Sequence, residues 1–448
     1  MNCELCIIGA GPGGYRAAEL AAKAGLKVVI IEAGHVGGTC LNVGCIPTKT
    51  YVHSATFAEA RERMAQVVSQ LRQGVETILS HPNITLVRGK ASFVDANTVE
   101  VQPLPSLTGE ESGMRSVISA DNIIIATGSE TKWLPIAGID DPRVVDSTGL
   151  LNLDTLPKRL CIIGAGVIGM EFACVFHRFG SEVTVIEYLK ECLPALDSDI
   201  AKRLRKYLEK PRACEGTSEM KSGITFKMKT AVEDIADIDA DCILMATGRK
   251  PHTEGLNLEA AGITLAHNGA IPVDDNFQVV DCKSSNCKLY AIGDCNGKQM
   301  LAHAAEAQAR IVVDQIINQK GAVANSSLFS LHSSLSIMPA AIFTTPEAAC
   351  VGPTEEQLKG QGIAYECRKA FWRANGKALA MNETEGMLKL FSEPDAGRIL
   401  GCHAYGAHSA DIIQEVSVLM CRDTTVNQLR YMVHIHPTLS EILLTASN

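Results

Sequence analysis

Residues 5–14 read Leu-Cys-Ile-Ile-Gly-Ala-Gly-Pro-Gly-Gly, and they determine how the first part of the chain folds. Four apolar residues predict a buried strand, and the alanine-rich run 17–24 after the glycines predicts a helix. The spacing of Gly9, Gly11 and Gly14 permits a tight turn, the close approach of a pyrophosphate, and packing of the helix against the strand. The stretch therefore predicts a dinucleotide-binding βαβ unit.

An acidic residue lies where such a unit binds a ribose. The next apolar strand, residues 27–31, ends in Glu32, eighteen residues after Gly14. A carboxylate at this point accepts hydrogen bonds from ribose hydroxyls. Glycine-rich turns alone are common, so the acid at the strand end is what makes the interpretation specific.

The same pattern recurs in the middle of the chain, where apolar residues 160–163 precede a second glycine turn and strand 182–186 ends in Glu187. The glycines of this second fingerprint are Gly164, Gly166 and Gly169. Two fingerprints predict two nucleotide-binding domains. Glu187 favours a free ribose 2′-hydroxyl and repels a 2′-phosphate, and Lys190 is the only cation that follows closely, so NAD is favoured over NADP.

Each fingerprint is followed by an apolar strand that ends in a small-residue turn. The two turns read Ala126-Thr127-Gly128 and Ala246-Thr247-Gly248. A third strand, residues 288–291, leads to Gly293 and Asp294. The carboxylate of Asp294 either hydrogen-bonds a ribityl or ribose hydroxyl or serves as a helix N-cap, and the segment alone favours neither.

Cys40 and Cys45 lie in the segment 37–49, directly after the first unit. In a regular α-helix residues five apart have Cα atoms roughly 8–9 Å apart, whereas a disulfide needs them within about 7 Å. The pair can therefore close only where the segment leaves helical geometry. Three glycines supply the backbone freedom for that departure: Gly37, Gly38 and Gly44. A disulfide at the mouth of a nucleotide site suits a two-electron relay, and the alternative is two buried free thiols.

Composition narrows the class of protein. A chain of 448 residues exceeds one ordinary core and predicts two to four domains. The net charge of −9, without a basic run, argues against a nucleic-acid partner. Residues 160–176 are apolar but contain Glu171, and no uncharged run approaches the length of a membrane span. Sixteen scattered cysteines are typical of a reducing compartment and predict a cytoplasmic protein. No metal-ligand cluster is visible, so no metal is expected. A strand is predicted to begin at residue 4, which leaves no room for an import sequence in this numbering.

The remaining segments are less regular. We expect a long helix over roughly 46–79, and a loop inserted at 210–223 that leaves a shortened stretch before the strand at 242. Cys282 and Cys287 repeat the five-residue spacing in a polar loop, where free surface thiols are expected, and a second redox pair is the alternative. Beyond about residue 336 a separate α+β domain is predicted, with strands at 341–343, 366–371, 387–391 and 399–404 and helices at 354–361 and 408–422.

These pieces, in this order, resemble the disulfide-linked flavoproteins of the pyridine nucleotide-disulfide oxidoreductase family, and its dihydrolipoamide dehydrogenases most closely. The motifs that carry the resemblance beyond those above are 292–294, 300–303, 345–347 and 434–441. The resemblance implies an α/β fold with two Rossmann-like domains and a C-terminal α+β dimerisation domain. It implies an FAD-binding domain at 1–150, to which 271–335 return, an NAD-binding domain at 151–270, and a homodimer interface domain at 336–448.

The resemblance also assigns redox roles. It implies that Cys40 exchanges with the substrate, that Cys45 lies against the flavin, and that Lys49 lies beside the flavin, paired with Glu171. It implies that His436 is the base, held by Glu441, and reaches the disulfide of the other subunit. A thiol with a pKa of about 8.5 is mostly protonated at neutral pH, so a nearby histidine is chemically apt. His434 alternates with His436 and is expected to face the other way and to be structural.

Cofactor contacts follow by position. The resemblance implies FAD contacts at Gly9, Gly11, Gly14, Glu32, Thr39, Ala126, Thr127, Gly128, Gly293, Asp294, Leu301, Ala302 and His303. It implies NAD contacts at Gly164, Gly166, Gly169, Glu187 and Gly248.

The implied activity is oxidation of a dihydrolipoyl dithiol with reduction of NAD⁺, for a lipoyl-bearing protein of a 2-oxoacid dehydrogenase or glycine cleavage complex. One alternative is another NAD(P)H-dependent disulfide reductase, similar to glutathione or mercuric reductase. A mercuric reductase would have a terminal cysteine pair, but the last cysteine is Cys421, and a glutathione reductase would have more cations near 187–193. The other alternative is a non-catalytic flavoprotein subunit. It predicts that at least one of the redox residues is replaced, but all four are present: Cys40, Cys45, His436 and Glu441.

Overall fold

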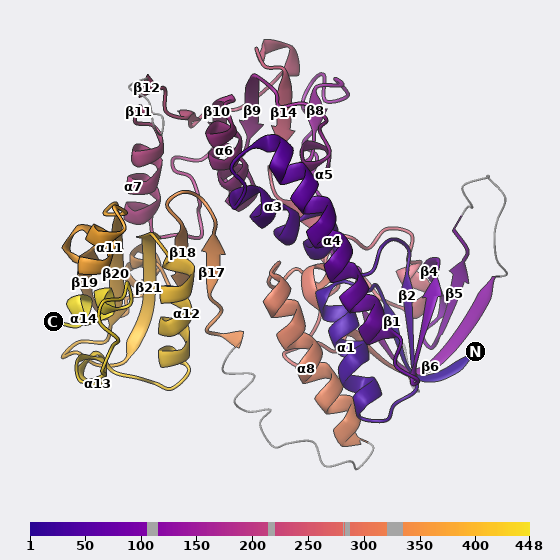
Figure 1. The fold of residues 1–448 in the computed structure, drawn as a ribbon. Helices are drawn as coiled ribbons and strands as arrows, with labels where there is room; N and C mark the ends of the chain where they lie inside the picture. Colours follow the sequence, from indigo (N-terminus) through magenta and orange to yellow (C-terminus); the bar gives the residue numbers. More distant parts are fainter. Residues whose placement is uncertain (105–114, 214–219, 281, 283–286, 320–334) are drawn as a thin grey trace. The chain divides into compact units, whose positions relative to one another are not determined.

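The computed structural model describes residues 1–104, 115–213, 220–280, 282, 287–319 and 335–448 (Figure 1). The chain forms two compact units, which are described separately below. Unit 1 consists of residues 1–50, 58–132 and 248–335, and unit 2 of residues 51–57, 133–247 and 336–448. The chain therefore changes units after Lys132 and after Thr247. The predicted domain boundaries at 150, 270 and 336 stay a prediction.

Strand pairing explains where the chain changes units. The short strands β7 (Ser129–Thr131) and β15 (Arg249–Pro251) pair with each other within unit 1. Strand β8 (Val144–Val145) instead joins β14 (Cys242–Met245) in unit 2. Both pairings join segments that are far apart in the sequence, so composition does not reveal where the chain changes units.

Unit 1 is built on a seven-stranded sheet in the order β3-β2-β1-β6-β5-β4, with β16 also paired to β6. Its strands are β1 (Asn2–Ile8), β2 (Val28–Glu32), β3 (Ile84–Arg88), β4 (Lys90–Asp95), β5 (Thr98–Gln102), β6 (Ser116–Ile125) and β16 (Lys288–Ala291). Strands β3, β2, β1, β6 and β16 run parallel, and β5 and β4 form an antiparallel edge.

Both faces of the parallel strands are covered, which explains why they are continuously apolar. Leu5 and Ile7 face a core shared with helices α1 (Pro12–Lys23) and α8 (Ala302–Gln319), which lie side by side (Figure 1). Cys6 and Ile8 face the opposite core, under β4 and β5. The predicted βαβ unit is thus confirmed, with its strand buried between two layers.

The helix expected over 46–79 is interrupted. It forms α3 (Cys45–Val52) and α4 (Phe57–Leu79), preceded by the short α2 (Gly38–Val43). The guanidinium of Arg178 donates to the carbonyl oxygens of Val52 at 2.7 Å, Tyr51 at 2.8 Å and Ser54 at 3.1 Å. Tyr51 and Val52 are the last two residues of α3, and Ser54 follows them, so Arg178 stabilises the end of this helix.

Unit 2 contains two sheets. The first is parallel, in the order β13-β10-β9-β14-β8, with strands β9 (Arg159–Ile163), β10 (Glu182–Glu187) and β13 (Thr225–Met228) beside β14 and β8. Its helices are α5 (Ser147–Leu151), α6 (Val167–Phe179) and α7 (Ser198–Leu208). Within the segment expected to be a loop at 210–223, β11 (Arg212–Ala213) pairs with β12 (Met220–Lys221). Between β13 and β14 residues 229–241 hold a single short 3-10 turn, η1 (Ile235–Asp237), so the shortened stretch is confirmed.

The second sheet of unit 2 is antiparallel, in the order β17-β18-β21-β20-β19. Its strands are β17 (Ala340–Ile342), β18 (Ala348–Val351), β19 (Glu366–Phe371), β20 (Gly386–Ser392) and β21 (Ile399–Gly406). Its helices are α10 (Glu355–Gly360), α11 (Gly376–Ala380), α12 (Ser409–Met420), α13 (Val426–Arg430) and α14 (Glu441–Ser447). The predicted α+β pattern of the C-terminal region is confirmed.

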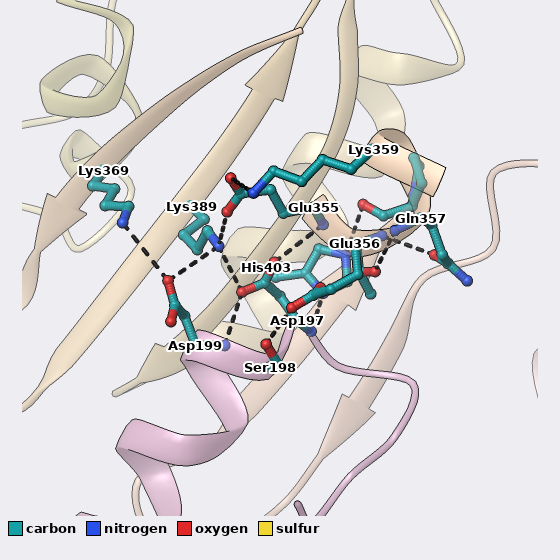
Figure 2. A network of polar contacts seen from close by, with 12 residues as sticks. Asp197, Ser198, Asp199, Glu355, Glu356, Gln357, Lys359, Lys369, Lys389 and His403 are labelled. Atoms are coloured by element: carbon teal, nitrogen blue, oxygen red, sulfur yellow. Dashed lines mark hydrogen bonds and ion pairs between the residues drawn. The ribbon is translucent and has the colours of Figure 1, made fainter. Parts of the chain in front are cut away.

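A buried ionic cluster joins the two sheets of unit 2 (Figure 2). Lys389 of β20 is 1 % exposed and donates to Asp197 at 2.7 Å and to Glu355 at 2.6 Å. Asp197 caps α7, while Glu355 begins α10. Burial lowers the pKa of Lys389, but its hydrogen bonds with the two carboxylates outweigh this effect and hold the pKa above its usual range.

Candidate active site

The cysteine segment leaves helical geometry where its glycines allow it. Helix α2 ends at Val43, Gly44 has φ −136° and ψ −111°, and α3 begins at Cys45. A Cβ atom on Gly44 would lie 2.9 Å from the carbonyl oxygen of Thr39, so only glycine fits this break. The two cysteines therefore lie on separate helical pieces, as a closable pair requires.

Cys40 and Cys45 are in contact as free thiols. Cys45 is exposed and Cys40 is half-buried. The hydrogen bond to Cys45, together with burial, raises the pKa of Cys40, while the charge of Lys49 acts in the opposite direction. Cys40 thus needs a base to become a nucleophile. Formation of a disulfide between the two stays a prediction. Cys282 and Cys287 are free thiols, as expected, but Cys287 is buried and does not lie at the surface.

The cysteine segment lies against the first glycine turn. The N–H of Gly37 donates to the carbonyl oxygen of Ala10 at 2.8 Å. A Cβ atom on Gly38 would lie 2.7 Å from the Cα of Gly11. A molecule bound on this turn would therefore lie next to the segment that carries the cysteines.

The first glycine turn fits a dinucleotide. A Cβ atom on Gly14 would lie 1.9 Å from the oxygen of Gly9, so helix and strand approach as closely as the fingerprint requires. Gly11 is the N-cap residue of α1, and no side chain caps this end, which leaves the helix N-terminus open for a phosphate. The carboxylate of Glu32 accepts from the N–H of Ala10 at 2.7 Å and of Gly34 at 2.6 Å, so it lies at the rim of the turn.

The second turn has the same construction. Glu187 accepts from the N–H of Ala165 at 2.6 Å and of Leu189 at 2.7 Å. A Cβ atom on Gly169 would lie 2.1 Å from the oxygen of Gly164, whereas a Cβ atom on Gly166 would meet nothing within 4 Å. The second acid is thus placed for a ribose, like the first.

Because a Cβ atom fits at Gly166 but not at Gly169, alanine substitutions at the two positions should have different effects, one on nucleotide binding and the other on stability. We expect Gly169→Ala to destabilise unit 2 by about 1–3 kcal/mol, because overpacking forces the backbone apart. Gly166→Ala should leave thermal unfolding unchanged and weaken NADH binding at least about tenfold, since its methyl group would occupy the approach of the pyrophosphate. Thermal unfolding and NADH titration of both FAD-loaded variants test this. Equal NADH affinity for Gly166→Ala and the parent would contradict the assignment.

Asp294 is held by two residues that the sequence did not single out. The hydroxyl of Ser129 donates to its carboxylate at 2.5 Å, and Nε of Arg249 donates to the same hydroxyl at 2.7 Å. Burial raises the pKa of Asp294, and the bond from Ser129 and the charge of Arg249 oppose this effect. The N-cap alternative is wrong, because Ile292 is the N-cap residue of the 3-10 turn η3 (Gly293–Asn296). The contact of Asp294 with a ribityl hydroxyl stays a prediction.

The other positions predicted to contact FAD lie on unit 1 as well. Thr127 donates from its hydroxyl to the carbonyl oxygen of His252 at 2.6 Å. Leu301 directly precedes α8, Ala302 and His303 form its first residues, and the His303 side chain is exposed. A Cβ atom on Gly13 would lie 3.2 Å from the oxygen of Ala305, so the start of α8 lies beside the fingerprint. The remaining positions are Thr39 in α2 and Ala126 and Gly128 after β6. Gly248, which was predicted to contact NAD, precedes β15 and also belongs to unit 1.

His436 and Glu441 form a pair in unit 2. Nδ1 of His436 is 2.9 Å from a carboxylate oxygen of Glu441, whose other oxygen accepts from the N–H of Thr438 at 2.9 Å. The backbone hydrogen bond and His436 lower the pKa of Glu441, so the carboxylate is ionised at neutral pH. The His436 side chain is 80 % exposed. A carboxylate fixes one ring nitrogen and leaves Nε2 available for proton transfer.

His434 is bound elsewhere, as predicted. Its Nε2 is 3.0 Å from a carboxylate oxygen of Glu415 in α12, and its side chain is 7 % exposed. By contrast, the residues around it are apolar and exposed: Tyr431 is 88 %, Val433 99 % and Ile435 80 % accessible. An apolar surface of this kind marks a protein interface.

Lys49 and Glu171 lie on different units, and their pairing stays a prediction. Lys49 is in α3, one turn after Cys45. Glu171 in α6 is 3 % exposed and accepts from the N–H of Phe343 at 2.9 Å.

Among the residues that the structure describes, no helix has the length and apolar composition needed to cross a lipid bilayer. Within the same residues, His, Cys, Asp and Glu side chains form no group of three or more that could hold a metal ion.

The chain is similar to curated proteins over nearly its whole length. It is 35% identical to dihydrolipoyl dehydrogenase of Geobacillus stearothermophilus, covering 100% of this chain and 96% of that protein. It is 34% identical to the mitochondrial dihydrolipoyl dehydrogenase of Pisum sativum, covering 99% and 90%. It is 35% identical to leghemoglobin reductase of Glycine max, covering 99% and 87%. Among solved structures, the HOCl-induced flavoprotein disulfide reductase RclA of Escherichia coli, as its Cu(II) complex, is similar with a TM-score of 0.87, 32% identity, and coverage of 100% and 99%.

Two family models match. Residues 3–309 match the pyridine nucleotide-disulphide oxidoreductase model, and residues 338–447 match the dimerisation domain of the same proteins. The predicted fold class, family, homodimer, FAD and NAD are thereby confirmed, and the exposed apolar residues before His436 lie within the matched dimerisation domain. The chain therefore belongs to the pyridine nucleotide-disulphide oxidoreductase family, whose members are dimeric flavoprotein enzymes that use FAD and NAD(H).

Proposed function

We propose that the protein is a dihydrolipoyl dehydrogenase, which oxidises a dihydrolipoyl dithiol and reduces NAD⁺. The observation that carries the proposal is the contact of Cys40 with Cys45 on a segment that lies against the first glycine turn. Identity of 34–35% with dihydrolipoyl dehydrogenases over the full chain supports it.

The residues support the following sequence of steps. In the oxidised enzyme, a substrate thiolate attacks the sulfur of Cys40 and breaks the Cys40–Cys45 bond, and the second substrate thiol then displaces Cys40 and closes the cyclic disulfide. His436 of the partner subunit, held by Glu441, takes the substrate protons. The chemistry that bound FAD supplies is passage of the resulting electron pair from the dithiol to NAD⁺. Glu32 and Asp294 would hold FAD, and Glu187 would hold the ribose of NAD⁺.

The domain assignment is part of the proposal. Unit 1 carries the FAD fingerprint and the cysteines, and residues 133–247 of unit 2 carry the NAD fingerprint. We propose a lipoyl-bearing protein of a 2-oxoacid dehydrogenase or glycine cleavage complex as the partner, and a cytoplasmic location.

A second candidate is an NAD(P)H-dependent disulfide reductase, in which electrons flow the other way. The similarity to the RclA disulfide reductase over the whole chain favours it. Both functions use the same cysteines, so only the substrate distinguishes them.

The test is NADH formation from NAD⁺ and dihydrolipoamide by the purified FAD-loaded protein, with NADP⁺ in parallel. We expect turnover with NAD⁺ and a preference over NADP⁺ of at least about 100-fold, because a like-charge contact between Glu187 and a 2′-phosphate costs several kcal/mol. Absence of dithiol oxidation, with NADH-dependent reduction of another disulfide intact, would reject the first candidate in favour of the second. Equal use of NADP⁺ would contradict the role of Glu187.

A further inference from the structure

Asn42 lies between the two cysteines and makes hydrogen bonds from both ends of its amide. The nitrogen donates to the carbonyl oxygens of Val36 at 3.0 Å and of Gly38 at 2.9 Å. The oxygen accepts from Nε of Arg72 at 3.1 Å and from Nη2 at 2.7 Å. One side chain thus ties α2 both to the turn before it and to α4.

The two ends of this connection are well anchored. The turn at Val36 to Gly38 is the one that touches the first glycine fingerprint, through Gly37 and Gly38. Arg72 belongs to α4, a helix of 23 residues that buries Val68, Val75 and Leu79 in the core of unit 1. Arg72 and Asn42 therefore connect α4 to the turn that lies against the first glycine fingerprint.

Helix α2 itself is short and makes little contact with the core. It has six residues, of which only Leu41 is buried. A helix so short is unstable on its own. An open pocket of about 190 Å³ lies beside Asn42, and its other lining residues belong to α4: Met64, Ala65, Val68, Ser69 and Arg72. Beside this pocket, the hydrogen bonds between Asn42 and Arg72 connect α2 to α4.

We propose that Arg72 and Asn42 are positioning residues that hold Cys40 next to Cys45 and thereby lower the reduction potential of the pair. The inference rests on the proposed redox role of these cysteines. Closing a disulfide removes the freedom that the segment has as a dithiol. A segment that is already held has less freedom to lose, so its disulfide forms more favourably. Releasing α2 should make the disulfide easier to reduce.

The potential is measurable through exchange with dithiothreitol. The thiols of Cys40 and Cys45 and cyclic oxidised dithiothreitol give the protein disulfide and reduced dithiothreitol, with two electrons and two protons passing to the reagent. Parent, Arg72→Met and Asn42→Ala enzymes, all as FAD-loaded dimers, are equilibrated at a series of reagent ratios. Acid quenching, alkylation and mass spectrometry of the peptide that contains residues 37–49 then give the oxidised fraction.

We expect the equilibrium constant for disulfide formation to fall about tenfold in both variants, which for a two-electron couple raises the potential by about 30 mV. Arg63→Met is the matched control, because Arg63 lies on the same helix and pairs with Glu59 at 3.7 Å. If Asn42→Ala does not fold, Arg72→Lys retains the charge, loses the paired donors, and should shift the potential in the same direction.

An unchanged potential in the variants would overturn the inference, whether or not their melting temperature falls, since lowered stability alone describes a merely structural contact. Failure of the parent pair to form a disulfide at any ratio would instead overturn the proposed function on which the inference rests.

Discussion

Cys45→Ser is expected to lower dihydrolipoamide-dependent NADH formation by at least about 10³-fold, the scale of losing a reacting group. A serine oxygen cannot form the bond to Cys40 whose cleavage takes up the two electrons on their way from substrate to cofactor. The loss should fall on the maximal rate, because the substrate still binds while the step that accepts its electrons is gone. Initial rates over a range of dihydrolipoamide concentrations measure this.

Two controls separate a lost relay from a damaged protein. Cys421→Ser removes an exposed thiol at the C-terminal end of α12 and should retain full activity. In Cys45→Ser itself, bound FAD and its reduction by NADH should persist, because no thiol takes part in that half of the reaction. A variant that kept more than about a tenth of the parent rate would contradict the relay, and loss of FAD would show that Cys45 supports the fold.

The parts of this site that could be predicted from the sequence are those governed by local rules. Gly14 and Gly169 are required by a strand-to-helix turn that admits no Cβ atom, and the acids that end β2 and β10 follow at a fixed distance. The break at Gly44 follows in the same way, since two cysteines five residues apart cannot meet on a regular helix. In each case the constraint and the residue that satisfies it lie within one supersecondary unit.

The parts that were missed depend on pairings between distant segments. The pairing of β7 with β15 brings together Ser129, Arg249 and Asp294. The spacing of residues in the sequence does not predict that these two strands pair. The points where the chain changes units depend on the same kind of pairing. Asn42 was visible within the cysteine segment, but its partner Arg72 lies 30 residues away on a helix face that otherwise reads as solvent-exposed.

The environment of Lys389 also depends on contacts between segments that are far apart in the sequence. The strand that contains it was predicted from its apolar neighbours, in which a single lysine reads as an exposed position. In the structure both neighbouring faces are buried, and the ammonium group is compensated by Asp197, which lies 192 residues away in the chain. A buried cation can be recognised only once the elements that surround it are known.

Lys389→Met is therefore expected to be strongly destabilising. It keeps most of the side-chain volume but leaves the carboxylate of Asp197, which is fully buried, without its cation. Removing one partner of a buried ion pair costs about 3–5 kcal/mol. Lys369→Met is the matched control: Lys369 lies on the adjacent strand, is 44 % exposed, and is 3.8 Å from the exposed carboxylate of Asp199, so its loss should cost about 0–1 kcal/mol (Figure 2).

The pH dependence of the free energy of unfolding independently tests why Lys389→Met is destabilising. Lys359 and Lys389 lower the pKa of Glu355 to about 2. The stability that this depressed pKa contributes is present above about pH 4.3, the usual value for glutamate, and is lost as the pH falls toward 2. The difference in stability between parent and Lys389→Met should therefore shrink as the pH falls from 5 toward 3. Urea unfolding of the FAD-loaded dimers at several pH values measures it.

A constant difference across this range would show that Lys389 acts through packing, since the stem of the side chain is the same at every pH. A difference no larger than that of Lys369→Met would show that the carboxylates are satisfied without it. Asp197 also accepts hydrogen bonds from the N–H groups of Asp199 at 3.2 Å and Glu355 at 3.1 Å. These two bonds orient the carboxylate without neutralising its charge, and for this reason we expect the cation, and not the hydrogen bonds alone, to hold the two sheets of unit 2 together.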